Sequence, residues 1–223
     1  MGLNIIFEDE YIIVLHKEPF VAVQTAKIGE KDLVSELKKY LGKDAFLGIV
    51  HRLDQPVEGV VVFAKTKQAA SFLSAQISEN SIKRDNQYKE KLMHKLYHAD
   101  VYGHMPSEEG YLEDYLLKDG RNNASKVVAS KNIKDAKLAV LHYRVIERCD
   151  EQERLEIELF TGRHHQIRVQ LANANCPILG DVKYGTDASK LYSKEQGIRN
   201  TSLVAYSLSL IHPSTGKRME FHL

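Results

Sequence analysis

Residues 51–66, HRLDQPVEGVVVFAKT, place charged side chains directly before an apolar run. The run VVVFA, residues 60–64, is rich in β-branched and aromatic side chains, which predicts a strand buried in the core. Arg52, Asp54 and Glu58 lie just ahead of that strand. Because charge next to a core is costly unless it is paired, the stretch constrains the fold and marks a candidate site.

Strand and helix patterns alternate along the rest of the chain. Residues 4–16 contain two β-rich runs broken by Glu8-Asp9-Glu10, which predicts a hairpin. Residues 31–42 space three leucines four apart and end in glycine, as an amphipathic helix does, and residues 68–79 have a similar spacing. Further strands are predicted at 95–103, 138–148 and 155–159. A mixed α+β domain follows.

Composition bounds the class of protein. With 223 residues, 43% hydrophobic and 27% charged, the chain predicts a single domain over 1–223, or one domain in two lobes. A formal charge of +1 neither demands nor forbids a polyanionic partner. Cys149 and Cys176 form no CxxC motif and follow no signal-like start, which favours free thiols and a cytoplasmic location. No stretch reaches the roughly 20 apolar residues that span a bilayer, so we expect no membrane partner.

Several familiar chemistries lack their motifs. There is no GxGxxG after a strand and no GxxxxGK[ST], GxSxG or HExxH. The motifs that usually indicate a nucleotide cofactor, a hydrolase serine or a zincin-type zinc site are therefore absent. His94 and His98 are four apart, and His164-His165 add two imidazoles. No cysteine or carboxylate completes an obvious ligand set, so these read as ordinary surface histidines and we expect no metal.

The carboxylates of residues 51–66 allow three interpretations. Paired acids can cleave a glycosidic bond, with Asp54 and Glu58 as acid and nucleophile. They can also be loop polarity with a surface ion pair. Asp54 differs from Glu58 in having Arg52 two residues away and the buried strand just downstream, which suits an ionised nucleophile. The residues alone therefore predict a candidate catalytic aspartate.

Two basic segments follow. Residues 78–95 are the most basic part of the chain, and a solvated face or loop is favoured there over a nucleic-acid contact. Further on, an alternating strand passes through Thr161-Gly162 into a basic helix start with His164, His165 and Arg168. Thr161 is the predicted N-cap of that helix.

Four segments in order resemble one known family. LGIVHRLDQPVEGVVVFAKT resembles the HRLD segment of the RluA-type pseudouridine synthases, and KLYHADVYG resembles their Lys-x-Tyr strand. TGRHHQIRVQLA resembles the GRxHQIR segment, and PILGDVKYG with SLSLIHPSTG completes the set. Any one match is weak, but four in order are specific, and they cover most of the chain.

The resemblance implies a largely antiparallel central sheet with flanking helices and a catalytic cleft. It implies an isomerase that converts uridine in ribosomal or transfer RNA to pseudouridine on a flipped-out nucleotide, without metal or cofactor. Asp54 matches the essential aspartate, Tyr97 the tyrosine that packs on the base, and Arg168 the arginine that pairs with the aspartate. The implied substrate-binding residues are Arg52, which would enter the RNA beside the flipped nucleotide, His165 and Gln166.

The chain also departs from the family pattern. Residues 55–59, QPVEG, replace the common Arg-Asp-Thr-Ser-Gly, and residues 17–20, KEPF, replace lysine-proline-x-glycine. The link over 78–94 is longer than usual, which makes Tyr88 a second candidate for the base-packing tyrosine. The chain starts in the catalytic segment, so we expect no separate RNA-binding domain before it, a monomer, and no DNA partner. The competing classes are a non-catalytic RNA-binding module and a glycosidase.

Overall fold

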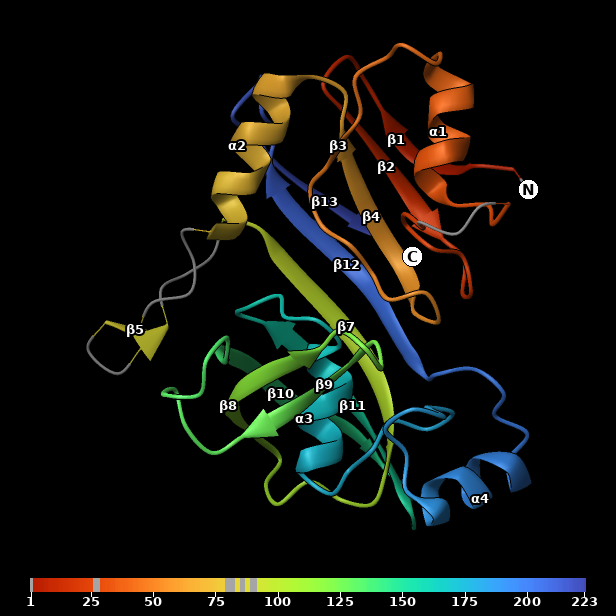
Figure 1. The fold of residues 1–223 in the computed structure, drawn as a ribbon, viewed down its shortest axis with the longest axis vertical. Helices are drawn as coiled ribbons and strands as arrows, with labels where there is room; N and C mark the ends of the chain where they lie inside the picture. The colour runs from red at the N-terminus through yellow and green to blue at the C-terminus, as the bar shows by residue number, and fades with distance from the viewer. Residues whose placement is uncertain (1, 26–28, 79–82, 85–86, 89–91) are drawn as a thin grey trace. The chain divides into compact units, whose positions relative to one another are not determined.

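The chain folds into two compact units in a computed structural model, which describes residues 2–25, 29–78, 83–84, 87–88 and 92–223 (Figure 1). Unit 1 comprises Met1–Lys95 and Ala205–Leu223, and unit 2 comprises Leu96–Val204. The chain passes from one unit to the other within strand β7 (His94–Tyr102) and within strand β12 (Leu203–Ile211). Unit 1 is therefore built from both ends of the sequence, whereas unit 2 is one continuous segment.

Unit 1 contains an antiparallel β1–β2 hairpin that continues into a larger sheet. The strand order is β1-β2-β4-β12, with β13 paired to β12 and β3 paired to β4. The pairs β1–β2, β2–β4, β3–β4 and β12–β13 are all antiparallel. The strand bounds are β1 Asn4–Glu8, β2 Ile12–Lys17, β3 Gly48–Ile49, β4 Glu58–Ala64 and β13 Arg218–His222.

The two faces of β4 are buried by different helices. Val60 and Val62 pack in a cluster with Leu73 of α2, Lys67–Ser78. Val61 and Phe63 pack in a second cluster with Leu33 and Leu37 of α1, Leu33–Leu41. A strand with apolar neighbours on both faces needs an unbroken apolar run, which explains the sequence VVVFA.

Unit 2 is an antiparallel sheet with two helices. Its strand order is β7-β11-β10-β8-β9, and each neighbouring pair is antiparallel. Val169 of α3 packs against Leu116 of β8 and Ala139 of β10. The bounds are β8 Glu109–Asp119, β9 Ala124–Val128, β10 Lys137–Arg148, β11 Gln152–Leu159, α3 Gln166–Asn173 and α4 Asp187–Glu195. A short hairpin, β5 Lys83–Arg84 with β6 Gln87–Tyr88, follows α2 in the chain.

These elements confirm the α+β fold with a largely antiparallel sheet. The predicted hairpin, both predicted helices and the predicted strands are present within a few residues of their expected bounds. Strands β8 and β9 were not predicted, because they are half-exposed and carry many polar side chains. The Thr161 N-cap is wrong: α3 begins after His165, which has a left-handed backbone, φ 53°. The Thr161 hydroxyl instead accepts from the Val140 N–H and donates to the Gln166 side chain.

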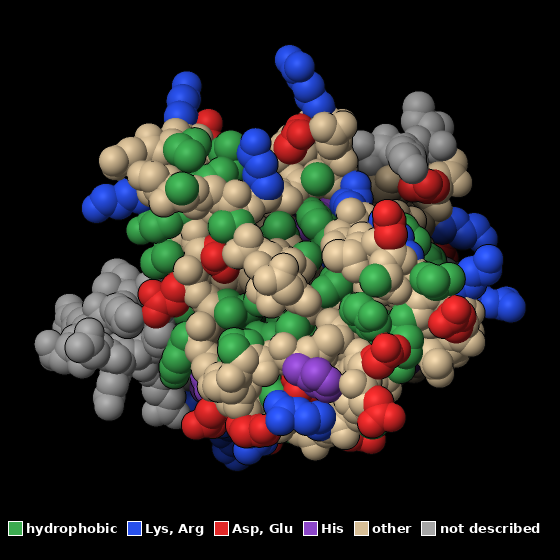
Figure 2. All heavy atoms as spheres, turned by 90° about the horizontal axis from the view of Figure 1, so that it is seen from below, with side chains coloured by type: hydrophobic (Ala, Val, Ile, Leu, Met, Phe, Trp, Pro, Cys, Tyr) green, Lys and Arg blue, Asp and Glu red, His purple; other side chains and the backbone are tan. Residues whose placement is uncertain are grey.

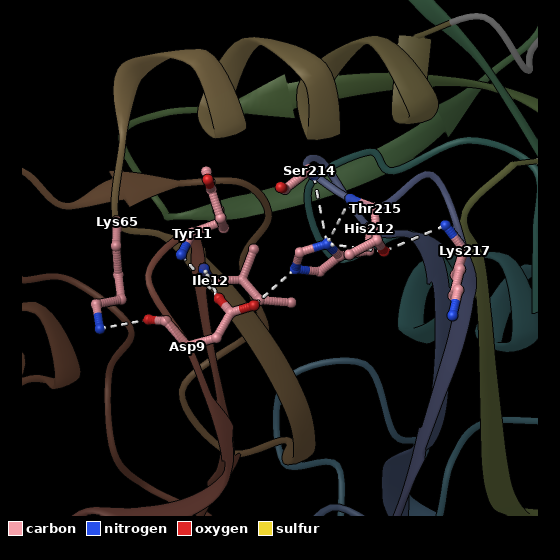
Figure 3. Close-up of polar contacts among 8 residues, drawn as sticks. All are labelled: Asp9, Tyr11, Ile12, Lys65, His212, Ser214, Thr215 and Lys217. Atoms are coloured by element: carbon pink, nitrogen blue, oxygen red, sulfur yellow. Dashed lines mark hydrogen bonds and ion pairs between the residues drawn. The ribbon is translucent and has the colours of Figure 1, made fainter.

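An aspartate and a histidine far apart in sequence connect two turns of unit 1 (Figure 3). Asp9 lies in the β1–β2 turn, where its Oδ1 accepts from the N–H groups of Tyr11 and Ile12. His212, in the β12–β13 turn, is 2.8 Å from Asp9 Oδ2 through Nε2. Its Nδ1 accepts from the N–H groups of Ser214 and Thr215, so the ring holds both turns. We call this pair the Asp9–His212 link.

Candidate active site

Asp54 lies in the loop between β3 and β4 of unit 1. It begins a turn in which its carbonyl accepts from the Val57 N–H at 3.0 Å. Leu53 and Val57 are buried on either side, while Asp54 is half-buried and Arg52 is exposed. Two apolar anchors thus fix the loop to the core and leave the carboxylate at its surface.

Lys17 is the main polar support of this loop. Its side chain is fully buried at the end of β2, and Nζ donates to the carbonyls of Glu18, Val21 and Gln55 at 3.0, 2.8 and 3.1 Å. Three donated hydrogen bonds need three N–H groups, so the geometry is that of an ammonium ion. The bond to Gln55 fixes the residue next to Asp54.

The charge of Lys17 is poorly compensated by its direct neighbours, which are neutral carbonyls. Burial lowers the pKa of Lys17 to about 8, and the nearby carboxylates of Asp54, Glu58 and Glu18 oppose this shift. Lys17 and Asp54 are therefore close enough to attract each other electrostatically. Sequence reasoning missed this role; the available signal was a lysine at the end of the apolar strand IIVLHK.

The second carboxylate of the loop has its own partner. Glu58 Oε1 is 2.8 Å from His16 Nε2, and the two side chains are 35% and 19% exposed. His16 is the neighbour of Lys17 on β2, and β2 pairs with β4 at this point. The acid that distinguishes this loop from the family pattern is therefore engaged by an imidazole.

His51, the histidine of HRLD, supports β4. Its Nε2 accepts from the Val62 N–H at 3.3 Å. Burial, together with the nearby charge of Lys95, lowers the pKa of His51 to about 3, so the ring stays neutral. A neutral imidazole is the form that can accept this hydrogen bond.

Tyr97 lies in β7 of unit 2, opposite Ile157 of β11, and is 5% exposed. Ala99 and Val101 follow it on the same face of the strand and are fully buried. Tyr97 therefore joins the core face of the unit 2 sheet. Tyr88, the second candidate, lies in β6, and residues 79–82, 85–86 and 89–91 of the basic segment are outside the described residues.

Arg168 forms a buried bidentate ion pair with Asp181. Nε and Nη2 donate to the two carboxylate oxygens at 2.7 and 2.8 Å, and the side chains are 5% and 0% exposed. Burial acts to raise the pKa of Asp181, but the Arg168 hydrogen bonds and the N–H groups of Lys183 and Tyr184 outweigh it, and the pKa is lowered. Asp54 and Arg168 belong to different units, and their pairing stays a prediction.

Gln166 and His165 are both buried. Gln166 Oε1 accepts from the Thr161 hydroxyl and the Arg163 N–H, and Nε2 donates to the Val140 carbonyl. Three of the four hydrogen bonds open to an amide side chain are thus made inside unit 2. His165 is stacked on His164 at 3.8 Å between ring centroids, so its description as a surface histidine is wrong.

The described part of the chain has no group of three or more His, Cys, Asp or Glu side chains that could hold a metal ion. No helix within those residues is long and apolar enough to cross a membrane. Cys149 and Cys176 are free thiols, one exposed and one buried. On the face seen in Figure 2, acidic and basic side chains are interspersed, with apolar ones between them.

The fold is that of solved pseudouridylate synthase domains. The human protein named RNA pseudouridylate synthase domain containing 1 superposes with a TM-score of 0.75 at 20% identity, covering 100% of this chain and 83% of that one. The human domain containing 4 gives 0.73 at 23% identity, covering 99% and 87%. At these identities the likeness concerns the fold.

Sequence comparison gives the family. The family model described as RNA pseudouridylate synthase matches residues 11–173. The ribosomal large subunit pseudouridine synthase D of Zymomonas mobilis is 34% identical over 98% of this chain and 68% of its own length. Synthase D of Neisseria meningitidis is 34% identical over 99% and 58%, and synthase C of Vibrio cholerae 28% over 98% and 64%.

The chain belongs to the RNA pseudouridylate synthase family, which is a family of isomerases. It spans 58% to 68% of the length of these three relatives. The resemblance found from the four sequence segments is thereby confirmed.

Proposed function

We propose that this protein isomerises uridine in RNA to pseudouridine and that Asp54 is its essential catalytic residue. The observation that carries the proposal is the support of Asp54 inside a chain of this family. The fully buried ammonium group of Lys17 donates to the carbonyl of Gln55, the residue next to Asp54, and so fixes the loop that carries the carboxylate. An ionised aspartate is the form that can attack the sugar or assist elimination there.

The reaction conserves the atoms of the uridine. The bond between N1 and the sugar C1′ breaks, the base turns, and C5 joins C1′. The proton of C5 leaves to solvent and N1 regains one, so no oxidant, reductant or second substrate is consumed. A uridine within folded RNA must leave its stack before these atoms are accessible, which is why the substrate is a flipped-out nucleotide.

The remaining residues receive supporting roles in this proposal. Tyr97 packs on the base and assists removal of the C5 proton. Arg168 orients Asp54. Arg52, exposed in the Asp54 loop, fills the space that the nucleotide leaves. His165 and Gln166 contact the substrate, and Gln166 has one N–H beyond its three intramolecular bonds for this purpose.

We propose ribosomal RNA of the large subunit as the substrate, since two kinds of relative are named for it. Transfer RNA is the alternative that the same assay measures. We further propose a cytoplasmic monomer that needs neither metal nor cofactor. Size-exclusion chromatography with light scattering tests the monomer.

The decisive experiment is tritium release from RNA labelled at C5 of uracil, taken from cells that lack the protein and assayed with EDTA and without nucleotide. Wild-type protein is expected to release tritium, and Asp54→Asn is expected to release none. Glu58→Gln is the matched control, since it neutralises the other carboxylate of the loop. Fractionating the RNA before the assay separates ribosomal from transfer RNA.

Absence of release from every RNA fraction by the wild type would overturn the proposal in favour of a non-catalytic RNA-binding module. Release that is lost in Glu58→Gln as well as in Asp54→Asn would indicate a two-carboxylate mechanism instead.

A further inference from the structure

Tyr184 contacts three separate parts of unit 2 that surround the proposed substrate-binding and orienting residues. Its phenol oxygen is 2.8 Å from His165 Nδ1 and accepts from the Ser125 N–H at 2.8 Å. Its ring faces the guanidinium of Arg168, with Cζ 5.1 Å from the ring centroid. One side chain therefore contacts His165 just before α3, Arg168 within α3, and strand β9.

The turn that carries Tyr184 is fixed by the same carboxylate that binds Arg168. Asp181 Oδ1 accepts from the N–H groups of Lys183 and Tyr184 at 2.9 and 3.2 Å, in addition to its bond with Arg168. The side chain of Asp181 is fully buried. The position of the Tyr184 ring and the position of the guanidinium are thus set by one group.

Two glycines make this turn possible. Gly180 has φ +73°, and a Cβ there would lie 1.9 Å from the Asn200 carbonyl oxygen. A Cβ on Gly185 would lie 2.5 Å from the Asp181 carbonyl oxygen. The spacing Gly180-Asp181-x-x-Tyr184-Gly185 is therefore a rigid unit that presents the tyrosine at a defined place.

His165 needs such a support. Its backbone is left-handed, φ 53°, which is unfavourable for a residue other than glycine, and its side chain makes no helix-cap bond. The Tyr184 hydroxyl and the stacked ring of His164 hold it. His164 is held in turn by the Ser125 hydroxyl and by Asn123, both in or beside the β8–β9 turn.

We infer that Tyr184 is a positioning residue that couples His165 to Arg168: its hydroxyl orients the imidazole and its ring orients the guanidinium. As part of this inference the phenol hydrogen points to Nδ1 of His165, an orientation that leaves the phenol oxygen open to accept from the Ser125 N–H. The imidazole is then fixed as the tautomer that carries its proton on Nε2. The consequence for catalysis rests on the proposed function, whereas the consequence for His165 does not.

Two substitutions separate the two contacts. Tyr184→Phe keeps the ring over Arg168 and removes the hydroxyl, so the contacts with His165 and the Ser125 N–H are lost while the contact with Arg168 stays. Tyr184→Leu removes both. Tyr192→Phe is the matched control, because it removes a phenol hydroxyl of unit 2 whose contact is with Gln152 of β11.

The first readout is the ¹⁵N spectrum of labelled histidine in the full-length protein without RNA. Wild type and Tyr192→Phe are expected to show His165 with an unprotonated Nδ1, and Tyr184→Phe a mixture of tautomers. His165 resonances in Tyr184→Phe that match wild type would overturn the inference. This result is independent of whether the protein is an enzyme, so it stays decisive if wild-type protein releases no tritium.

The second readout is the tritium-release rate as a function of RNA concentration. Loss of one hydrogen bond that orients a substrate contact should raise KM about three- to tenfold in Tyr184→Phe with kcat near wild type. Tyr184→Leu should in addition lower kcat about tenfold, because Arg168 loses its ring contact. Equal loss of kcat in both variants, with KM unchanged, would indicate a merely structural tyrosine and overturn the proposal. If Tyr184→Leu does not fold, Tyr184→Phe alone decides.

Discussion

The two units hold their charged groups in opposite ways. In unit 1 the buried cation Lys17 is bonded to three neutral carbonyls, and the carboxylates that favour its charge are not hydrogen-bonded to it. In unit 2 the buried cation Arg168 meets a buried carboxylate through two parallel hydrogen bonds. The Lys17 charge can therefore be removed by titration, whereas the Arg168–Asp181 pair keeps both of its groups charged. We expect a loop that responds to pH in unit 1 and a rigid frame in unit 2.

The largest effect should come from breaking the rigid pair. Arg168→Met leaves the Asp181 carboxylate buried and unpaired, which should lower the free energy of unfolding by about 3–5 kcal/mol in urea denaturation. Arg154→Met is the control, because its pair with Asp100 is 47% and 27% exposed and should contribute less than about 1 kcal/mol. Similar losses in both variants would contradict the distinction between the two units.

Removing the buried cation of unit 1, Lys17, should lower the free energy of unfolding less than Arg168→Met does, and its main effect should be on activity. Lys17→Met fills the space but leaves three carbonyls without their donor, which should lower the free energy of unfolding by about 1–3 kcal/mol. Tritium release should fall with it, since the turn next to Asp54 loses its support. Lys65→Met also removes a unit 1 lysine, which contacts Glu8 and Asp9, and should leave tritium release unchanged. Equal activity of both variants would refute the support role.

Alkaline pH should act on the charge of Lys17 in unit 1 rather than on the Arg168–Asp181 pair of unit 2. With the pKa of Lys17 near 8, half of its ammonium is lost at about pH 8, so the activity that depends on it should halve there. The folded pKa lies below the ordinary value of 10.5, so the folded state binds fewer protons between these values. This group therefore makes the free energy of unfolding rise with pH across that window. An activity profile flat to pH 10 would contradict the prediction.

Acid should destabilise unit 2 through Asp181. The pKa of Asp181 is lowered, so its contribution to stability is present above the ordinary carboxyl value of 3.8. That contribution is lost as pH falls further, through the folded pKa. Acid denaturation of wild type compared with Asp181→Asn measures this contribution: the stability difference between the two should be largest and constant above pH 5 and should shrink as pH falls below 3.8.

The smallest effect is expected at Glu58. Its pair with His16 is partly exposed, so Glu58→Gln should change the free energy of unfolding by less than about 1 kcal/mol. Tritium release should remain close to wild type. A large loss of activity would assign Glu58 to the chemistry and remove the difference between the two carboxylates of the loop.

Sequence reasoning predicted the elements in which the local spacing of apolar residues shows which side chains are buried. The run VVVFA and the leucine spacing of α1 record neighbours on one or both faces, so β4 and α1 were predictable. Strands β8 and β9 contribute few buried side chains and depend mainly on pairing with their neighbours, so their local sequence pattern does not predict them.

The candidate site was predictable only in part, for the same reason. Asp54 could be named because it lies within a short motif beside a buried strand. Lys17, Asp181 and Tyr184 act through contacts with residues that are distant in sequence, such as Gln55 for Lys17 and Ser125 for Tyr184. Their residue types alone do not reveal those partners. The Thr161 prediction failed because a good N-cap residue was used instead to join β10 to Gln166.

The Asp9–His212 link also bears on how the chain is made. Its two members are 203 residues apart, and β12 and β13 complete a sheet that begins with β1. On a ribosome the residues of unit 2 emerge as one block and can fold as soon as they are out. In unit 1 the Asp9–His212 link can form only after His212 has been synthesised. We therefore expect unit 1, which carries the candidate catalytic loop, to be completed after unit 2 although its first residues are synthesised earlier.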